Sequence, residues 1–243
     1  MDTIAIIGGG CAGCGAAYQL HKRLGPNASL TMFERNEYVG GRVFDLTFAD
    51  CFMEIGGSLL HSSGQLTNEM MEFADCTEGV SSLNIDGKNE TYAFWTDRGF
   101  AVCTRTTLAS MALGILKHVG IGSALRVTNN AKAMAEKFEG IYEQLEEHAP
   151  FATPDEVFDA IGLLEPTKIS TADYFKQIRV NDRMAYDVVE PITHNMYNQG
   201  SEMNALASLV GLAGAGLAGG HLFVVDGGNR TLYDRMITCH GDV

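Results

Sequence analysis

Positive charge is scarce in this sequence of 243 residues. Only 17 lysine and arginine residues stand against 30 aspartate and glutamate residues, which gives a formal net charge of −13 at pH 7. Such a charge repels nucleic acids and anionic membrane surfaces, and no basic stripe is present to bind a phosphate backbone. We therefore set nucleic-acid binding aside. The sequence also contains no feature from which a protein partner is inferred.

Cysteine is present, but it lacks the spacing of a disulfide framework or a zinc site. The spacing is irregular, and a chain of this length does not need disulfides to fold. Cys11 and Cys14 form a C-x-x-C pair, as in redox and zinc sites, but no second pair completes a metal site. Because the pair lies inside a glycine-rich turn, we interpret both as small helix residues with reduced thiols and predict no metal site. The cysteines are Cys11, Cys14, Cys51, Cys76, Cys103 and Cys239.

The sequence also lacks a convincing membrane span, a leader peptide and internal repeats. Residues 204–225 are uncharged, but they contain five glycines and His221, and their flanking charges are Glu202 and Asp226 rather than Lys or Arg. We predict a buried helix, a glycine turn and a buried strand there, and no transmembrane segment. No positively charged region precedes the first apolar run, so the default expectation is a cytoplasmic protein.

The strongest pattern present is a glycine fingerprint at the N-terminus. A β-branched run, Ile4 to Ile7, predicts a strand buried on both faces of a parallel sheet. It is followed by G-x-G-x-x-G, a helix ending near Leu24, a second strand from Leu30 to Phe33, and Glu34. Glu34 comes 21 residues after the last glycine, close to the spacing at which an acid reaches a ribose hydroxyl. The order predicts an α/β fold with a Rossmann-type domain, whose fingerprint glycines are Gly8, Gly10 and Gly13.

The residues after Glu34 favour one dinucleotide over the others. A carboxylate at this position disfavours the 2′-phosphate of an NADP-type cofactor. Arg35 begins a loop in which the doublet Gly40-Gly41 is followed by Arg42, and this loop resembles the second fingerprint of the flavoprotein amine-oxidase superfamily. In that superfamily the loop wraps the FAD pyrophosphate, where an arginine supplies charge-assisted hydrogen bonds. Together the two motifs predict FAD.

The middle of the chain has a different pattern. Residues 43–53 and 92–103 read as hairpins, and the periodicity then becomes helical, with a capping box at Thr153-Pro154-Asp155-Glu156 and a further cap at Ser170 or Thr171. We therefore expect residues 1–80 to form the first part of the FAD-binding domain and residues 81–200 to form a mainly helical substrate domain inserted into it. Residues 201–243 are expected to return to the flavin and substrate region.

Three C-terminal runs resemble the prenylcysteine oxidase family. Tyr197 to Gly200, Leu209 to Ala215 and Asp226 to Asn229 are similar to that family's N-Y-G-Q, V-S-L-A-G-A and E-G-G-N-K runs, and Glu54 to Ser58 with His61 is similar to its E-I-G-G-S-x-x-H. The resemblance covers essentially the whole chain. It adds flavin contacts at Gly56, Gly57 and Ser58, substrate contacts at Asn198, Gly200, Gly214 and Ala215, and His61 as a candidate catalytic residue.

The resemblance implies a flavin-dependent thioether oxidase. Its substrates would be farnesyl- or geranylgeranyl-cysteine and O₂, and its products cysteine, a prenyl aldehyde and hydrogen peroxide. The flavin would supply most of the reactivity, so no single base is required. The resemblance also makes the lysosome or vacuole an alternative to the cytoplasm. Two other interpretations stay open: a different oxidoreductase of the amine-oxidase type, and a catalytically incomplete FAD-binding fragment.

The sequence departs from the family pattern in two places. Gln199 and Ser201 stand where the family has tyrosine and glutamine, so substrate contacts are expected to differ. Family members also continue well past the G-G-N run, whereas this sequence ends at Val243. On that basis the chain is expected to bind FAD weakly and to turn over slowly.

Overall fold

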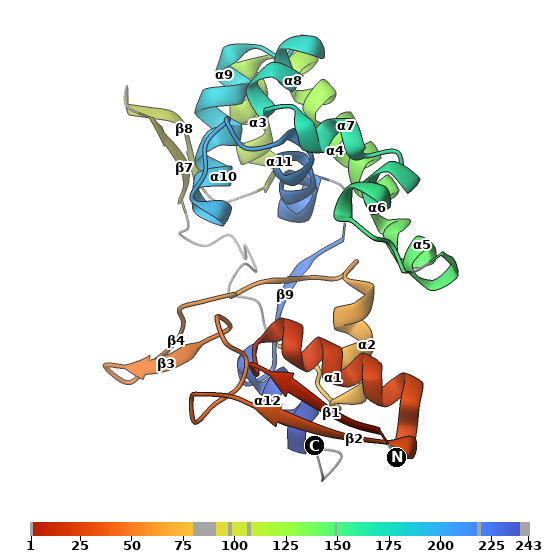
Figure 1. The fold of residues 1–243 in the computed structure, drawn as a ribbon. Coiled ribbons are helices and arrows are strands. Elements are labelled where there is room, and N and C mark those ends of the chain that lie inside the picture. The colour runs from red at the N-terminus through yellow and green to blue at the C-terminus, as the bar shows by residue number, and fades with distance from the viewer. Residues whose placement is uncertain are drawn as a thin grey trace. The chain divides into compact units, whose positions relative to one another are not determined.

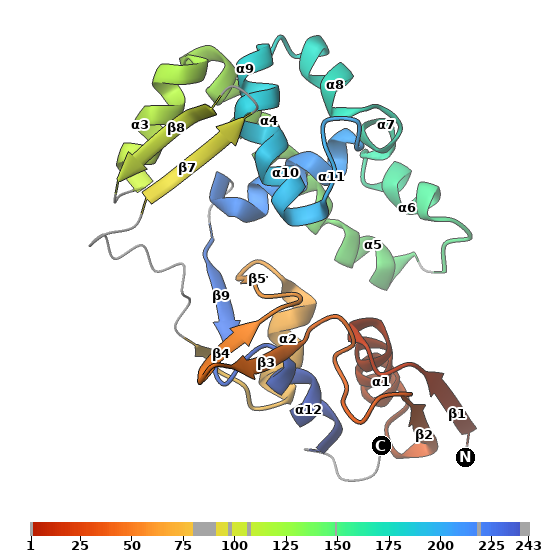
Figure 2. The ribbon, with the colours of Figure 1, turned by 90° about the vertical axis from the view of Figure 1, so that its left-hand side faces the viewer.

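The computed structural model of the chain divides into two compact units. It describes residues 2–79, 91–96, 99–105, 108–148, 150–217 and 220–238. Unit 1 comprises Met1–Asn84 and His221–Val243, and unit 2 comprises Ile85–Gly220. Helices and strands are labelled in Figure 1, and Figure 2 gives a second view. In the described part of the chain, no helix combines the length and the apolar character that crossing a membrane requires.

Unit 1 begins with the predicted strand, helix and strand. Strand β1 (Asp2–Ile7) pairs in parallel with β2 (Ala28–Phe33), from Asp2 opposite Ala28 to Ile7 opposite Phe33. Helix α1 (Cys11–Leu24) connects them through a 3₁₀ turn, η1 (Gly25–Asn27), and lies alongside the pair in Figure 1. Gly25 adopts a positive φ of 52° at the end of the helix, as the Gly-Pro-Asn sequence predicts. The predicted α/β class is confirmed.

The burial of β1 differs from the expectation. Ile6 is 8% exposed, but Ile7 is 81% exposed and Phe33, its neighbour on β2, is 57% exposed. The prediction that β1 is buried on both faces is therefore wrong. Only one partner strand pairs with β1 in the described residues, and every second residue from Thr3 to Ile7 is exposed.

The rest of unit 1 joins the two ends of the chain. Strand β9 (Leu222–Val225) pairs antiparallel with β5 (Leu60–His61) on one side and β6 (Glu78–Gly79) on the other. Helices α2 (Gln65–Phe73) and α12 (Arg230–Thr238) share a core with Cys14 and Tyr18 of α1. The predicted hairpin turns at Ala49 and Asp50, which both adopt positive φ. The strands of this hairpin are β3 (Asp45–Phe48) and β4 (Cys51–Glu54).

Unit 2 is mainly helical, with one hairpin made of β7 (Thr91–Thr96) and β8 (Gly99–Arg105). Its hairpin turn, Asp97-Arg98, lies outside the described residues. The Thr153 hydroxyl accepts from the Glu156 N–H at 3.3 Å, and the Ser170 hydroxyl accepts from the Asp173 N–H at 3.1 Å, so both expected helix starts are present. The helices are α3 (Leu108–Val119), α4 (Ile121–Glu139), α5 (Ile141–Glu147), α6 (Pro154–Ala160), α7 (Leu164–Lys168), α8 (Thr171–Gln177), α9 (Asp182–Met184), α10 (Glu190–Tyr197) and α11 (Ala205–Leu212), with π-helical segments η2 (Ala185–Val189) and η3 (Ala213–Leu217).

Helix α11 lies in the core of unit 2. Leu206, Leu209 and Leu212 are 5% exposed or less and pack in the same core as residues of α4, α8 and η2. Figures 1 and 2 both show α11 among the other helices of this unit. We expected residues 201–220 to group with the last part of the chain. The structure instead places them in unit 2, because α11 has apolar side chains on most of its surface and buries them among helices.

Candidate functional site

Two fingerprint positions, one in the turn after β1 and one in helix α1, require glycine. Gly8 adopts φ +100° and donates its N–H to the Phe33 carbonyl at 2.8 Å, which ties the turn to the end of β2. A Cβ on Gly13 would lie 1.9 Å from the Gly8 carbonyl oxygen, so α1 approaches the strand too closely for any side chain. The spacing G-x-G-x-x-G therefore sets the distance between strand and helix.

The N-terminus of α1 is open to an anion. No side chain caps the first turn at Gly10, and the turn contains no acidic residue. The unpaired N–H groups and the positive end of the helix dipole are the features with which helices bind pyrophosphate. A Cβ on Gly10 would meet only the Gly41 Cα, at 3.8 Å, so little crowds the backbone there. The turn therefore fits the pyrophosphate of a dinucleotide.

The second glycine loop lies directly against the first. The Gly40 N–H donates to the Gly9 carbonyl at 2.7 Å, and Gly40 and Gly41 have φ values of +98° and +61°. A Cβ on Gly41 would lie 3.0 Å from the Gly10 Cα. The structure thus brings Gly8, Gly10, Gly13, Gly40 and Gly41 together, as expected for a bipartite dinucleotide site.

Glu34 is oriented by backbone groups of both loops. Its carboxylate accepts from the Asn36 N–H at 2.9 Å and from the Gly9 N–H at 2.7 Å. These hydrogen bonds, the one from Asn36 first, hold the pKa of Glu34 below its ordinary value. The side chain therefore stays ionised and fixed at the end of β2, where an acceptor for ribose hydroxyls is expected.

The two predicted arginines belong to the second loop, and the described residues offer their side chains no ion pair. Arg35 and Arg42 are exposed, and no ion pair joins either of them to another described residue. The Arg42 carbonyl, by contrast, has a structural role, because it accepts from the Gly57 N–H at 3.1 Å. A Cβ on Gly56 would lie 1.8 Å from this same oxygen. The Gly56-Gly57 doublet therefore lies against the second loop.

Asn229 connects this doublet to the last part of the chain. It is 1% exposed, donates from Nδ2 to the Gly57 carbonyl at 3.0 Å, and accepts at Oδ1 from the Val225 N–H at 2.8 Å. Its own N–H donates to Glu54 Oε1 at 2.6 Å. One side chain and one N–H thus join segments about 170 positions apart in sequence.

A cleft of about 740 Å³ lies between these segments, within the size range of ligand-binding clefts. Glu54 and Ser58 line it from one side and Gly227 and Gly228 from the other. Oε2 of Glu54 is buried and has no hydrogen-bond partner in the described part of the chain. Burial raises the pKa of Glu54, the Asn229 N–H opposes this, and Asp45 adds to it. Glu54 thus borders the cleft and has one buried oxygen that no described residue satisfies.

Sequence reasoning did not assign roles to three residues that hold this site together. Glu54 and Asn229 belong to the runs that resemble the family, but those runs do not predict a role for either residue. Arg230, at the start of α12, pairs with Asp45 at 3.3 Å and lies over the rings of Tyr38 and Phe44 at 5.8 and 5.9 Å. The signal available for Asn229 and Arg230 was the G-G-N run, in which an asparagine followed by a basic residue ends a glycine turn, and the signal for Glu54 was its place just before the Gly56-Gly57 doublet.

The remaining predicted residues lie elsewhere. His61 belongs to β5, its Nδ1 contacts the Ser63 hydroxyl at 2.8 Å, and it is not among the described residues that line the cleft. In unit 2, Asn198 ends α10 in a left-handed conformation with φ +53°, and Gly200 has the carboxylates of Glu190 and Glu202 beside it. Gly214 and Ala215 follow α11 in η3; Ala215 is exposed, and a Cβ on Gly214 would meet no atom within 4 Å.

Two family models match the chain. The family described as prenylcysteine lyase matches residues 108–241, more than half of the chain. The NAD(P)-binding Rossmann-like domain matches residues 6–77, which include both glycine loops and Glu34. The predicted Rossmann-type domain is therefore confirmed.

Named relatives give the same result. Farnesylcysteine lyase from Arabidopsis thaliana is 30% identical over 257 residues, which cover 99% of this chain and 50% of the relative. Prenylcysteine oxidase 1 from Homo sapiens is 26% identical over 248 residues, which cover 97% of this chain and 45% of the relative. The chain thus spans about half the length of the curated relatives it matches, and its predicted resemblance to prenylcysteine oxidases is confirmed.

Solved structures share the fold. Putrescine oxidase bound to putrescine aligns with a TM-score of 0.63 at 19% identity, covering 99% of this chain and 49% of that one. A fatty acid isomerase from P. acnes that produces CLA aligns with a TM-score of 0.55 at 17% identity, covering 98% and 50%. At these identities the likeness concerns the fold alone.

Proposed function

The chain belongs to the prenylcysteine lyase family, and from this premise we propose that it takes part in the FAD-dependent oxidative cleavage of farnesyl- or geranylgeranyl-cysteine. The observation that carries the cofactor assignment is the meeting of the two glycine loops, Gly40 N–H to Gly9 carbonyl at 2.7 Å, beside the ionised Glu34. In this proposal unit 1 is the cofactor domain and unit 2 contributes substrate contacts.

The residues of unit 1 have distinct roles in this proposal. The first turn of α1 and the loop with Gly40, Gly41 and Arg42 bind the pyrophosphate, and Glu34 accepts from the ribose. Gly56, Gly57 and Ser58 line the flavin side. When bound there, FAD would supply the two-electron oxidation of the thioether, so that prenylcysteine, water and O₂ give cysteine, prenyl aldehyde and hydrogen peroxide overall. The protein's part is to bind, orient and exclude water, so no general base is assigned.

The cofactor assignment is tested by changing Glu34. We expect Glu34→Ala to weaken FAD binding by about 1.5–3 kcal/mol, because it removes hydrogen bonds from the ribose to a charged acceptor. Glu37→Ala is the matched control, since Glu37 is an exposed carboxylate in the same turn. Binding is measured by flavin fluorescence during titration. Purified folded protein that takes up NADH but shows no flavin absorbance after incubation with FAD would contradict the assignment.

The substrate assignment is tested at the end of α11. A prenyl chain is a long hydrocarbon, and each methylene taken from water contributes about 0.8 kcal/mol, so its site should be an apolar tunnel. Gly214 has open space around it and Ala215 is exposed, so a phenylalanine at either position occupies volume without disturbing the core. We expect Gly214→Phe or Ala215→Phe to raise KM for farnesylcysteine about tenfold, or about 1.4 kcal/mol, with FAD binding unchanged.

The assay quantifies cysteine, prenyl aldehyde and peroxide together. Ala160→Phe, at an exposed position of α6, is the control for an added aromatic side chain in unit 2. Equal changes in KM for the α6 and α11 variants would remove Gly214 and Ala215 from the substrate site. An FAD-loaded protein that oxidises amines, and releases no cysteine from farnesylcysteine, would instead favour an oxidoreductase of the amine-oxidase type.

A further inference from the structure

Two thiols occupy the first turn of the helix that begins the dinucleotide site. Cys11 is the first residue of α1 and Cys14 lies three positions further on. Residues at this spacing in an α-helix have Cα atoms about 5 Å apart, which follows from the helix rise and radius. That separation lies within the range that a disulfide spans, about 4.4–6.8 Å. The backbone therefore places the two residues where a disulfide forms without a large movement.

Both thiols contact the crossing of the two glycine loops. Cys11 Sγ donates to the Gly40 carbonyl at 3.7 Å, and Cys14 Sγ donates to the Gly9 carbonyl at 3.4 Å. The Gly40 N–H itself donates to that Gly9 carbonyl at 2.7 Å. The two sulfur atoms thus lie at one small region of the structure, on carbonyls that belong to opposite loops.

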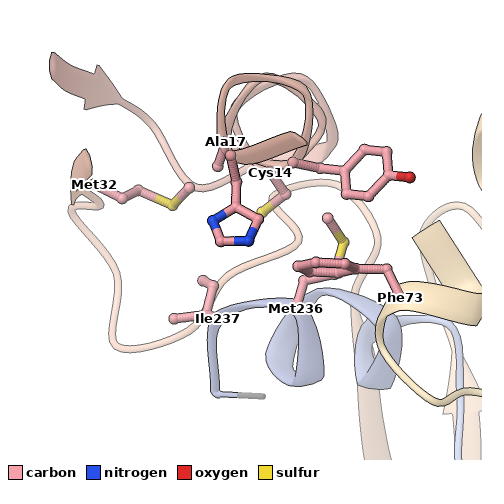
Figure 3. Close-up of a pocket in the computed structure, with 8 residues that line it drawn as sticks. Cys14, Ala17, Met32, Phe73, Met236 and Ile237 are labelled. Atoms are coloured by element: carbon pink, nitrogen blue, oxygen red, sulfur yellow. The ribbon is translucent and has the colours of Figure 1, made fainter. Parts of the chain in front are cut away.

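The two thiols differ in access. Cys11 is exposed and lies near the buried Tyr233 of α12. Cys14 is 1% exposed and faces a small apolar pocket; Figure 3 shows its sulfur on the side of α1 that faces Met236 and Ile237. Burial, together with the neighbouring Cys11, raises the pKa of Cys14 to about 11. Cys14 therefore stays protonated and shielded at neutral pH, and an oxidant from solvent reaches Cys11 first.

We propose that Cys11 and Cys14 are a peroxide-oxidised dithiol, with Cys11 as the attacked and Cys14 as the resolving residue. The Cys11 sulfur attacks one oxygen of hydrogen peroxide, the O–O bond breaks, and the products are Cys11 sulfenic acid and water. The Cys14 sulfur then attacks the Cys11 sulfur, the S–O bond breaks, the disulfide forms, and a second water carries away the Cys14 proton. Two electrons pass from the thiols to the peroxide.

Oxidation acts on the dinucleotide site because a disulfide has no S–H donor. Both hydrogen bonds that the thiols make to Gly9 and Gly40 are lost when the disulfide forms. These are weak donors, so we expect FAD affinity to fall roughly three- to tenfold rather than to vanish. This consequence rests on the proposed function, whose product peroxide would then lower the occupancy of its own site. The oxidation itself does not depend on that function.

The experiment treats the purified protein with hydrogen peroxide and follows one peptide by mass spectrometry. Trypsin cleavage after Lys22 yields residues 1–22, in which Cys11 and Cys14 are the only cysteines. The expected result is the loss of two hydrogen masses from this peptide and its recovery with dithiothreitol. In Cys14→Ser, Cys11 should instead accumulate as a sulfenic acid that dimedone captures. In Cys11→Ser, Cys14 should remain a free thiol, and Cys51→Ser, which changes an exposed cysteine of β4, should behave as the parent protein.

The same samples give a second readout through FAD affinity before and after oxidation. A peptide that keeps two free thiols at peroxide concentrations that oxidise Cys51 would overturn the proposal, and so would equal oxidation of Cys14 in Cys11→Ser. A disulfide that forms with no change in FAD affinity would overturn its link to the site. Failure of the reduced protein to bind FAD would count against the proposed function, and the mass measurement would still decide whether the dithiol exists.

Discussion

Replacing Gly13 by alanine is expected to abolish measurable FAD binding and to destabilise unit 1 by about 3 kcal/mol or more. The added Cβ would lie 1.9 Å from the Gly8 carbonyl oxygen and 3.1 Å from its carbon, and both are backbone atoms that no rotamer change moves. Helix α1 must therefore shift away from β1. That shift displaces the N-terminus of the helix from the loop at Gly40, where the pyrophosphate is proposed to bind.

Gly15→Ala is the matched control for this experiment. Gly15 lies in the same helix, and a Cβ there would meet no atom within 4 Å. Because alanine is the better helix former by about 1 kcal/mol, this variant should be as stable as the parent or more stable. Flavin fluorescence measures binding, and hydrogen exchange of peptides from α1 and β2 measures local stability. Similar losses in the two variants would show that replacing either glycine of this helix is harmful, and the close approach at Gly13 would not be the cause.

The parts of the fold predicted from sequence are those with local causes. The glycine spacing specified the turn from β1 to α1, because the close approach at Gly13 leaves no room for another residue. The position of Glu34 at the end of β2 followed from counting along one strand, helix and strand. The helix starts at Thr153 and Ser170 followed from hydroxyl groups that accept from N–H groups three residues later. Each of these features involves residues close together in sequence or in one motif.

The features missed depend on contacts between distant segments. Asn229 reaches Gly57 across 172 positions, and no periodicity in the sequence marks that pair. The exposure of Ile7 depends on which strands pair with β1, a property of the sheet and not of the apolar run. The site in unit 1 was therefore predicted as a set of glycine loops, and the hydrogen bonds that hold those loops to β9 and α12 came from the structure.

The side chain of Asn229 provides the second large effect. Asn229→Ala is expected to destabilise unit 1 by about 2–4 kcal/mol, because it leaves the buried Val225 N–H without a partner, removes the donor to the Gly57 carbonyl and opens a cavity. The bond from its N–H to Glu54 is a backbone bond and remains. Asn68→Ala is the control. Asn68 is exposed, and its side-chain Nδ2 donates to the Ser62 carbonyl at 2.9 Å. Loss of this exposed hydrogen bond should lower the free energy of unfolding by about 1 kcal/mol or less. Urea denaturation with hydrogen exchange of unit 1 peptides measures both.

Asn229→Asp separates the two hydrogen bonds by pH. An aspartate oxygen still accepts from the Val225 N–H, but an ionised carboxylate cannot donate to the Gly57 carbonyl, and it adds negative charge near Glu54. Protonation restores a donor, so the folded state binds this proton more tightly than the unfolded state, and the pKa of Asp at this position should be raised in the folded protein. The stability of Asn229→Asp relative to Asn229→Ala should therefore rise as the pH falls through that raised pKa, and level off below the unfolded value of about 3.9. Glu54 titrates in both variants, so the difference between them reports the new carboxylate together with its coupling to Glu54. A difference between them that stays constant from pH 7 to pH 4 would show that the Gly57 carbonyl does not need the donor that Asn229 supplies.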